Sequence, residues 1–282
     1  MRKIYLLTLT FCIFFAMAPG SITASEKTEP APPGYDEYRS GIPHGEMNMI
    51  TYYSTTVGVN RNALVYTPPG YSPKKKYNVL YLLHGIGGDE NEWNDQMNPQ
   101  NILDNLYAEN KLEPMIVVFP NGRAMEDDRP IGDIFDPEKI AAFERFEGDL
   151  LNDLIPHIES EYPVWKNRHH RALAGLSMGG GQSLNFGLNN LDTFSWVGAF
   201  SAAPNTKAPE ELLVDPKKIS KRLHLLWLSC GDEDGLLSIS ENFHNSLTEN
   251  NIPHKWYLDQ GGHEPAVWSS GLYHFSQQLF KK

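Results

Sequence analysis

Short apolar runs alternate with amphipathic stretches along most of the chain, and this alternation strongly constrains the fold. Several runs are apolar on consecutive residues, as expected for parallel strands that are covered on both faces. Seven ranges are predicted to be strands: 63–66, 79–83, 115–119, 171–176, 196–200, 223–229 and 255–258. The pattern therefore predicts an α/β fold, with a mostly parallel sheet and helices on both faces.

The clearest helical pattern covers residues 140–161, where apolar side chains repeat at steps of three and four. Pro156 lies inside this pattern and predicts a kink or an earlier end. Further helices are predicted at 100–110, 178–190, 238–250 and 266–280. Residues 121–137 are polar and rich in Asp, Gly and Pro, which predicts a long loop of the kind that often lies over an active site.

The N-terminal residues 1–24 predict a secretory signal peptide. Arg2 and Lys3 precede an apolar run of about 15 residues, which is shorter than the roughly 20 that a membrane span needs. An uncleaved N-terminal anchor is the alternative. Residues 25–45 are rich in Pro and Glu and predict a linker or a surface-hugging arm. Residues 46–282 are long enough for one large domain, which we expect to act outside the cytoplasm, secreted or periplasmic, with no membrane contact after signal removal.

Composition excludes some partners. The formal net charge is −11, and removal of a signal carrying Arg2 and Lys3 makes the chain more acidic, which disfavours nucleic acid. The two cysteines are Cys12, inside the predicted signal, and Cys230, so no disulfide is expected in the mature chain. No spacing of His, Cys, Asp and Glu predicts a metal site, and no cofactor is expected.

The strongest local motif is Gly-Leu-Ser-Met-Gly at 175–179. It follows a predicted strand and opens a predicted helix, which is the context of a nucleophile elbow. A tight strand-to-helix turn exposes the hydroxyl of Ser177, and the flanking glycines leave room for that turn. A chance match in a loop is the alternative, and the strand–helix context argues against it.

A serine nucleophile needs a general base that is oriented by an acid. In an α/β sheet of this kind the acid and then the histidine follow the serine in the sequence. His263 comes after the last predicted strand and two glycines, so it is the predicted base. Asp232 and Asp234 both follow the strand at 223–229, and their positions alone do not decide which of them is the acid.

The glycine-rich segment His-Gly-Ile-Gly-Gly at 84–88 follows the strand at 79–83. Loops in this position supply one backbone donor of an oxyanion hole. The Met178 N–H is predicted to be the first donor and the Ile86 N–H the second. An ordinary strand-to-helix turn is the alternative reading of the segment, and His84 is expected to have a structural role beside it.

Together these motifs resemble the esterase D-like α/β-hydrolases, specifically the feruloyl and acetylxylan esterases of carbohydrate esterase family 1. The likeness covers residues 41–280 and rests on the segments at 65–71, 81–88, 174–183, 201–205 and 260–263. In similar sequences the acid is the last residue of a Cys-Gly-x-x-Asp stretch, which here is Asp234. One departure is that two glycines precede His263, where such sequences often carry three.

The resemblance implies a secreted serine esterase that hydrolyses acyl esters on plant cell-wall polysaccharide, most simply a feruloyl esterase releasing ferulate from arabinoxylan. Its expected partner is a feruloylated or acetylated plant polysaccharide or oligosaccharide. The alternatives are an acetylxylan esterase, an acyltransferase and a non-catalytic glycan-binding protein on the same fold. Gln182, in the helix after Ser177, and Trp268, five residues after His263, are candidate substrate-binding residues.

Overall fold

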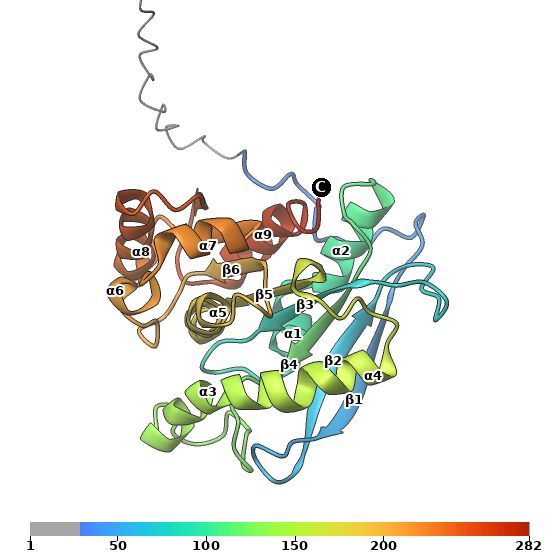
Figure 1. Cartoon of the computed structure of the whole chain (residues 1–282). Helices are drawn as coiled ribbons and strands as arrows, with labels where there is room; N and C mark the ends of the chain where they lie inside the picture. The colour runs from blue at the N-terminus through green and yellow to red at the C-terminus, as the bar shows by residue number, and fades with distance from the viewer. Residues whose placement is uncertain (1–28, 282) are drawn as a thin grey trace, which may run out of the picture.

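The computed structural model describes residues 29–281, so the predicted signal peptide at 1–24 lies outside the described residues. A sheet of eight strands forms the centre, in the order β1-β2-β4-β3-β5-β6-β7-β8 (Figure 1). Its strands are β1 (Glu46–Tyr53), β2 (Asn60–Thr67), β3 (Asn78–Leu83), β4 (Met115–Pro120), β5 (Arg171–Leu176), β6 (Trp196–Phe200), β7 (Leu225–Gly231) and β8 (Lys255–Asp259). β1 and β2 pair antiparallel, and the strands from β4 to β8 pair parallel, which confirms the predicted mostly parallel sheet.

Helices cover both faces of the sheet, as predicted (Figure 1). One face is covered by α1 (Glu92–Met97), α2 (Pro99–Ala108) and α9 (Pro265–Ser276). The other is covered by α3 (Pro137–Asp149), α4 (Ile155–Glu161), α5 (Met178–Asn189), α6 (Pro209–Leu212), α7 (Pro216–Arg222) and α8 (Leu237–Glu249). Each set of helices closes its own apolar core against the sheet, so the central strands are buried on both sides.

The helical pattern at 140–161 neither ends early nor remains a regular α-helix. A π-helical segment, Leu150–Leu154, joins α3 to α4 and precedes Pro156, which lies in the first turn of α4. Because proline has no N–H to give to the preceding turn, it is tolerated at the start of a new helical register. The preceding residues 121–136 contain no helix or strand, as predicted for a long loop.

The described part of the N-terminal segment, residues 29–45, is an arm that lies against α2 and α9. The Asn105 side chain donates hydrogen bonds of 2.9 Å to the carbonyls of Tyr35 and Glu37. The ring of Tyr35 contacts the ring of Tyr273 edge to face at 5.2 Å. Within residues 29–281 no helix is long and apolar enough to cross a membrane.

The parallel pairing decides where functional groups gather. β3, β5, β6, β7 and β8 are successive neighbours that all run in the same direction. Their carboxyl ends therefore lie along one edge of the sheet, where open α/β sheets collect their binding and catalytic groups. The loops that follow β3, β5, β7 and β8 carry the motifs identified in the sequence.

Candidate active site

Ser177 occupies the sharp turn between β5 and α5. Its backbone angles are φ 51° and ψ −116°, a conformation that residues with a side chain rarely adopt and that costs on the order of 1–3 kcal/mol. Hydrogen bonds hold the turn: the Ser177 N–H donates to Phe200 O at 2.9 Å, and the Ala203 N–H donates to Ser177 O at 3.1 Å. The turn is therefore fixed by its neighbours in β6 and in the segment that follows β6.

The two glycines of the motif are required by close backbone approach. A Cβ atom on Gly175 would lie 2.6 Å from the carbonyl carbon of Gly179. A Cβ atom on Gly179 would lie 2.6 Å from the carbonyl oxygen of His84. Both distances are shorter than van der Waals contact with backbone atoms, so the elbow and the loop after β3 pack together only because these positions lack side chains.

The structure brings Ser177, His263 and Asp234 into one hydrogen-bonded chain. The Ser177 Oγ lies 3.0 Å from His263 Nε2, and His263 Nδ1 lies 2.9 Å from Asp234 Oδ2. The Leu236 N–H donates to the other carboxylate oxygen, Asp234 Oδ1, at 2.7 Å. Such a chain lets the imidazole accept the serine proton while the carboxylate fixes the ring.

Asp232, the alternative acid, lies elsewhere. Its Oδ1 accepts the Gly261 N–H at 2.9 Å and so supports the loop that leads to His263. Asp234 is buried, and burial raises its pKa, but the hydrogen bonds from the Leu236 amide and His263 outweigh burial and lower that pKa below its usual value. The acid that faces the histidine is therefore an ionised carboxylate at neutral pH.

The two predicted oxyanion donors lie on either side of the nucleophile. The Met178 amide starts α5, and the Ile86 amide lies in the loop after β3. This loop is close to the serine, because a Cβ atom on Gly85 would lie 3.4 Å from the Cβ of Ser177. Among residues 29–281 neither amide has a hydrogen-bond acceptor, so both are free to bind an oxyanion.

His84 is buried, and the hydrogen bonds of its ring in the described structure go to the loops after β3 and β4 and not to the serine. Its Nδ1 donates to Gly85 O at 2.6 Å, and its Nε2 accepts the Gly122 N–H at 2.7 Å. Burial is the main cause that lowers the pKa of His84 to about 4. The ring is therefore neutral at physiological pH and holds the loops after β3 and β4 together, which agrees with the structural role predicted for it.

The two predicted substrate-binding side chains are both buried in the structure, and their substrate-binding role stays a prediction. Gln182 is 1% exposed, and its Nε2 donates to the carbonyls of Gly122 at 2.9 Å and Phe143 at 2.6 Å. Trp268 is 7% exposed and packs edge to face on the His263 ring, with centroids 5.0 Å apart. Gln182 thus ties α5 to α3 and to the loop after β4, and Trp268 packs against the ring of the histidine.

Sequence reasoning did not identify an apolar group beside the nucleophile. Phe143, Met178 and Ala203 form a buried cluster, and Ile86, Ile140 and Leu236 pack against it while remaining partly exposed. We call these six side chains the apolar rim. Four of its members come from the loop after β3, from α3 and from the loop after β7, so only the folded chain brings them together.

Two cavities flank the segment that follows β6. One, of about 520 Å³, lies between this segment and α8, and the other, of about 380 Å³, lies between it and α3 and α5. They share Thr206, Lys207 and Ala208. The segment starts next to Ala203, whose N–H donates to Ser177 O, but Ser177, Asp234 and His263 line neither cavity. In residues 29–281 no group of three or more His, Cys, Asp or Glu side chains is arranged to hold a metal ion.

Comparison with known proteins shows which family the chain belongs to. The model of the Esterase family matches residues 54–270, which is more than half of the chain. The chain is 33% identical over 250 residues to an endo-1,4-beta-xylanase/feruloyl esterase of Xylanibacter ruminicola, and the match covers 86% of the chain and 32% of that protein. It is 29% identical over 220 residues to endo-1,4-beta-xylanase Y of Acetivibrio thermocellus, with 71% and 19% covered. The chain thus spans a third or less of the length of these two relatives.

Solved structures give a similar result. The chain superposes on a CE1 ferulic acid esterase from Anaeromyces mucronatus with a TM-score of 0.79 and 29% identity, covering 91% of this chain and 98% of that one. The structure of that esterase in complex with ferulic acid matches with the same TM-score and 28% identity. These neighbours are α/β-hydrolases, which agrees with the predicted fold class.

Proposed function

Because the chain belongs to the Esterase family and is a carboxylic ester hydrolase with the α/β-hydrolase fold, we propose that it releases hydroxycinnamates such as ferulate from plant cell-wall polysaccharide. The observation that carries this proposal is the apolar rim beside Ser177. Its partly exposed Ile86, Ile140 and Leu236 offer more apolar surface than an acetyl group can cover. A phenylpropenoyl group is large, flat and apolar enough to bury them.

The proposed reaction uses the chain of hydrogen bonds at the elbow. Ser177 Oγ attacks the ester carbonyl carbon while His263 Nε2 takes its proton, and Asp234 stabilises the resulting imidazolium. The Met178 and Ile86 amides bind the oxyanion of the tetrahedral intermediate. As that intermediate collapses, the sugar alcohol leaves with the proton from His263. Water, deprotonated by His263, then attacks the acyl-enzyme, and the free acid is released.

The sugar part of the substrate is proposed to lie along the segment after β6. The two cavities there are within the usual size of ligand sites, and their lining includes the polar side chains of Thr206, Lys207 and Asn242. Polar side chains of this kind suit a hydroxyl-rich polymer. A polymeric substrate also fits the predicted signal peptide, so we propose that the protein acts outside the cytoplasm, secreted or periplasmic.

A substrate panel on the purified chain lacking residues 1–24 tests the proposal. We expect higher kcat/KM on methyl ferulate and feruloylated arabinoxylan than on p-nitrophenyl acetate or acetylated xylan. The Ser177→Ala variant is expected to lose at least about 10⁴-fold in kcat on every ester, because the nucleophile is removed. Preference for acetyl esters would favour an acetylxylan esterase, and acyl transfer to a sugar in competition with water would favour an acyltransferase. No turnover by the wild type would favour a glycan-binding protein.

A rim variant separates acyl specificity from general activity. Ile140→Ser removes an apolar contact worth roughly 1–3 kcal/mol to a bound ring, so kcat/KM on methyl ferulate is expected to fall by about tenfold or more. The value on p-nitrophenyl acetate is expected to change little. Val214→Ser is the matched control, because Val214 is 79% exposed and lies outside the rim. Equal losses on both esters would contradict the assignment of the rim to the acyl group.

A further inference from the structure

Three successive peptide groups of the loop after β3 are each hydrogen-bonded by a side chain, and none of these side chains is hydrogen-bonded to the serine in the described structure. We call residues 84–88 the oxyanion loop, because the proposed function assigns the Ile86 amide to the oxyanion, and the inference below rests on that assignment. Three side chains bind its backbone: Glu92, His84 and Arg123.

Glu92 fixes the first peptide group. Its Oε2 accepts the Gly85 N–H at 2.6 Å. The carboxyl group also fills the inside of the loop, since a Cβ atom on Gly88 would lie 2.4 Å from Glu92 Cδ. The peptide between His84 and Gly85 is therefore held by the start of α1.

His84 fixes the second peptide group, between Gly85 and Ile86. Because Nε2 accepts the Gly122 N–H, the ring proton is on Nδ1, which donates to Gly85 O at 2.6 Å. In a trans peptide the C=O and the N–H point in opposite directions. The ring that holds the Gly85 oxygen therefore also sets the direction of the Ile86 N–H.

Arg123 fixes the third peptide group, between Ile86 and Gly87. Its Nη2 donates to Ile86 O at 2.6 Å, and its Nη1 donates to Asp128 O at 2.7 Å and Gly88 O at 3.4 Å. The guanidinium also lies over the ring of Phe143, with 5.0 Å to its centroid. The side chain is fully buried. One cation thus ties the oxyanion loop to the loop after β4.

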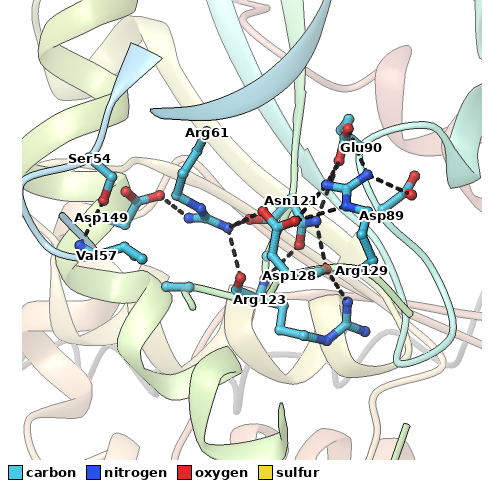
Figure 2. A network of polar contacts seen from close by, with 12 residues as sticks. Ser54, Val57, Arg61, Asp89, Glu90, Asn121, Arg123, Asp128, Arg129 and Asp149 are labelled. Atoms are coloured by element: carbon cyan, nitrogen blue, oxygen red, sulfur yellow. Dashed lines mark hydrogen bonds and ion pairs between the residues drawn. The ribbon is translucent and has the colours of Figure 1, made fainter. Parts of the chain in front are cut away.

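The backbone of Arg123 is itself held by a polar network (Figure 2). Its N–H donates to Asn121 Oδ1 at 3.0 Å, and its carbonyl accepts a 2.8 Å hydrogen bond from Arg61. Arg61 pairs with buried Asp149 on α3. The position of Arg123 is therefore set by β2, the loop after β4 and α3, together with the His84 ring that binds the preceding Gly122 N–H.

These contacts leave the Ile86 N–H unpaired at the centre of the loop, and the Gly87 N–H that follows it has no partner either among the described residues. Within residues 29–281, the Gly85 N–H, the Gly85 oxygen and the Ile86 oxygen all have side-chain partners, whereas the Ile86 N–H has none. We propose that Arg123 is a positioning residue. It fixes the peptide group that follows Ile86, while His84 and Glu92 fix the two before it, and together they hold the Ile86 N–H toward the oxyanion without touching the substrate. A donor fixed in advance stabilises a transition state more than one that must reorient during the reaction.

The test compares Arg123→Met with Arg145→Met. Arg145 carries the same charge on α3, but its guanidinium contacts Ala124 O and Glu138 and none of residues 84–88. We expect Arg123→Met to lower kcat by about 10- to 100-fold with KM changed less than about twofold, because only the charged intermediate loses its support. Arg145→Met is expected to keep the wild-type kcat.

Inhibitor binding supplies a readout that a purely structural role would not move. A phenylboronic acid, which forms a tetrahedral adduct with the serine, is expected to bind Arg123→Met weaker by the same factor as the loss in kcat. The planar product ferulate is expected to bind unchanged. Arg123→Lys keeps one donor for Ile86 O and is expected to recover part of both losses. It also covers the case in which Arg123→Met does not fold.

Unchanged kcat and boronate affinity in a folded Arg123→Met or Arg123→Lys variant would overturn the inference. Equal weakening of boronate and ferulate would do the same, because it would show general damage to the site. These outcomes are distinct from failure of the proposed function. The experiment uses whichever ester the wild type cleaves best, whereas the proposed function fails if Ser177→Ala retains activity or if ferulate esters are not cleaved.

Discussion

Two aspartates follow β7, and their side chains have different surroundings. Asp234 is buried, contacts His263 and accepts the Leu236 amide, and the Cys230 thiol lies 3.5 Å from its Oδ2. Asp232 accepts only the Gly261 amide among its side-chain contacts in the described residues. Asp234 therefore stabilises the protonated imidazole of His263. Asp232 instead stabilises the loop that carries His263.

The variant Asp234→Asn is expected to lower kcat by about 10³- to 10⁴-fold. An amide in this position no longer stabilises the imidazolium, and its NH₂ group favours the wrong histidine tautomer. Asp232→Asn is the matched control: its amide oxygen still accepts the Gly261 N–H, so activity within about twofold of wild type is expected. The kcat of both variants is measured by steady-state kinetics on one ester. Similar losses in the two variants would show that the assignment of the acid is wrong.

For single residues, the sequence predicted the nucleophile and the base but not all of the side-chain hydrogen bonds around them. Ser177 and His263 stand in local motifs, and the structure places them 3.0 Å apart. The choice of Asp234 over Asp232 needed the family resemblance, because the direction of a side chain in a turn is not visible in spacing. The hydrogen bonds of Gln182 could not be predicted for a related reason: its partners, Gly122 and Phe143, are 60 and 39 residues away in the chain.

The elbow is an element whose shape depends on contacts from outside it. The strained Ser177 backbone persists because β3, β6 and the start of α5 pack tightly around it. One of the tight contacts is between Gly179 and the carbonyl of His84, the residue that begins the oxyanion loop. Stability and catalysis therefore depend on the same backbone contact.

Gly179→Ala is expected to destabilise the fold by about 3 kcal/mol. The new methyl group would lie 2.6 Å from a backbone oxygen that has no freedom to move away. Gly41→Ala is the control, since a Cβ atom there has nothing within 4 Å and a change within about 0.5 kcal/mol is expected. Urea unfolding measures both. A Gly179→Ala variant as stable as wild type would show that the elbow relaxes more easily than its contacts indicate.

Elements with long apolar runs were predicted well, and short or exposed ones were not. β5 and β6 have the predicted limits, because their residues are buried throughout. β1 was missed: its inward residues Met47, Ile50 and Tyr52 do not alternate strictly, and most of the strand is exposed. α6, with four residues, and α7, with seven, are too short to show a helical period.

The whole molecule contains several histidines whose pKa is lowered mainly by burial: His84, His224, His244, His254 and His274. Two of them form a pair, with 2.7 Å between His244 Nδ1 and His254 Nε2. A neutral buried histidine resists protonation in the folded state but takes up a proton freely in the unfolded chain. Folding stability is therefore complete above the unfolded pKa of about 6.5 and decreases as the pH falls below it.

We expect the free energy of unfolding to decrease between pH 6.5 and pH 4. His84, with its pKa lowered to about 4, contributes the most, on the order of 3 kcal/mol. The raised pKa values of Glu92 and Asp128, caused first by burial, oppose this trend. Urea titrations at pH 7, 5.5 and 4 measure the slope, and a folded His84→Asn variant is expected to show a shallower one. A wild type equally stable at pH 7 and pH 4 would contradict the expectation.

The position of β8 has a consequence for how activity develops during folding. β8 is one of the two edge strands of the sheet, its sole partner among the described strands is β7, and the base His263 follows it in the chain. Ser177, by contrast, follows a central strand, and 86 positions separate it from the histidine. The serine and the histidine meet only when the sheet is complete from β5 to β8, because one residue follows β5 and the other follows β8. A refolding chain therefore regains ester hydrolysis no earlier than the moment its last strand joins the sheet, which makes enzyme activity a reporter of completed assembly.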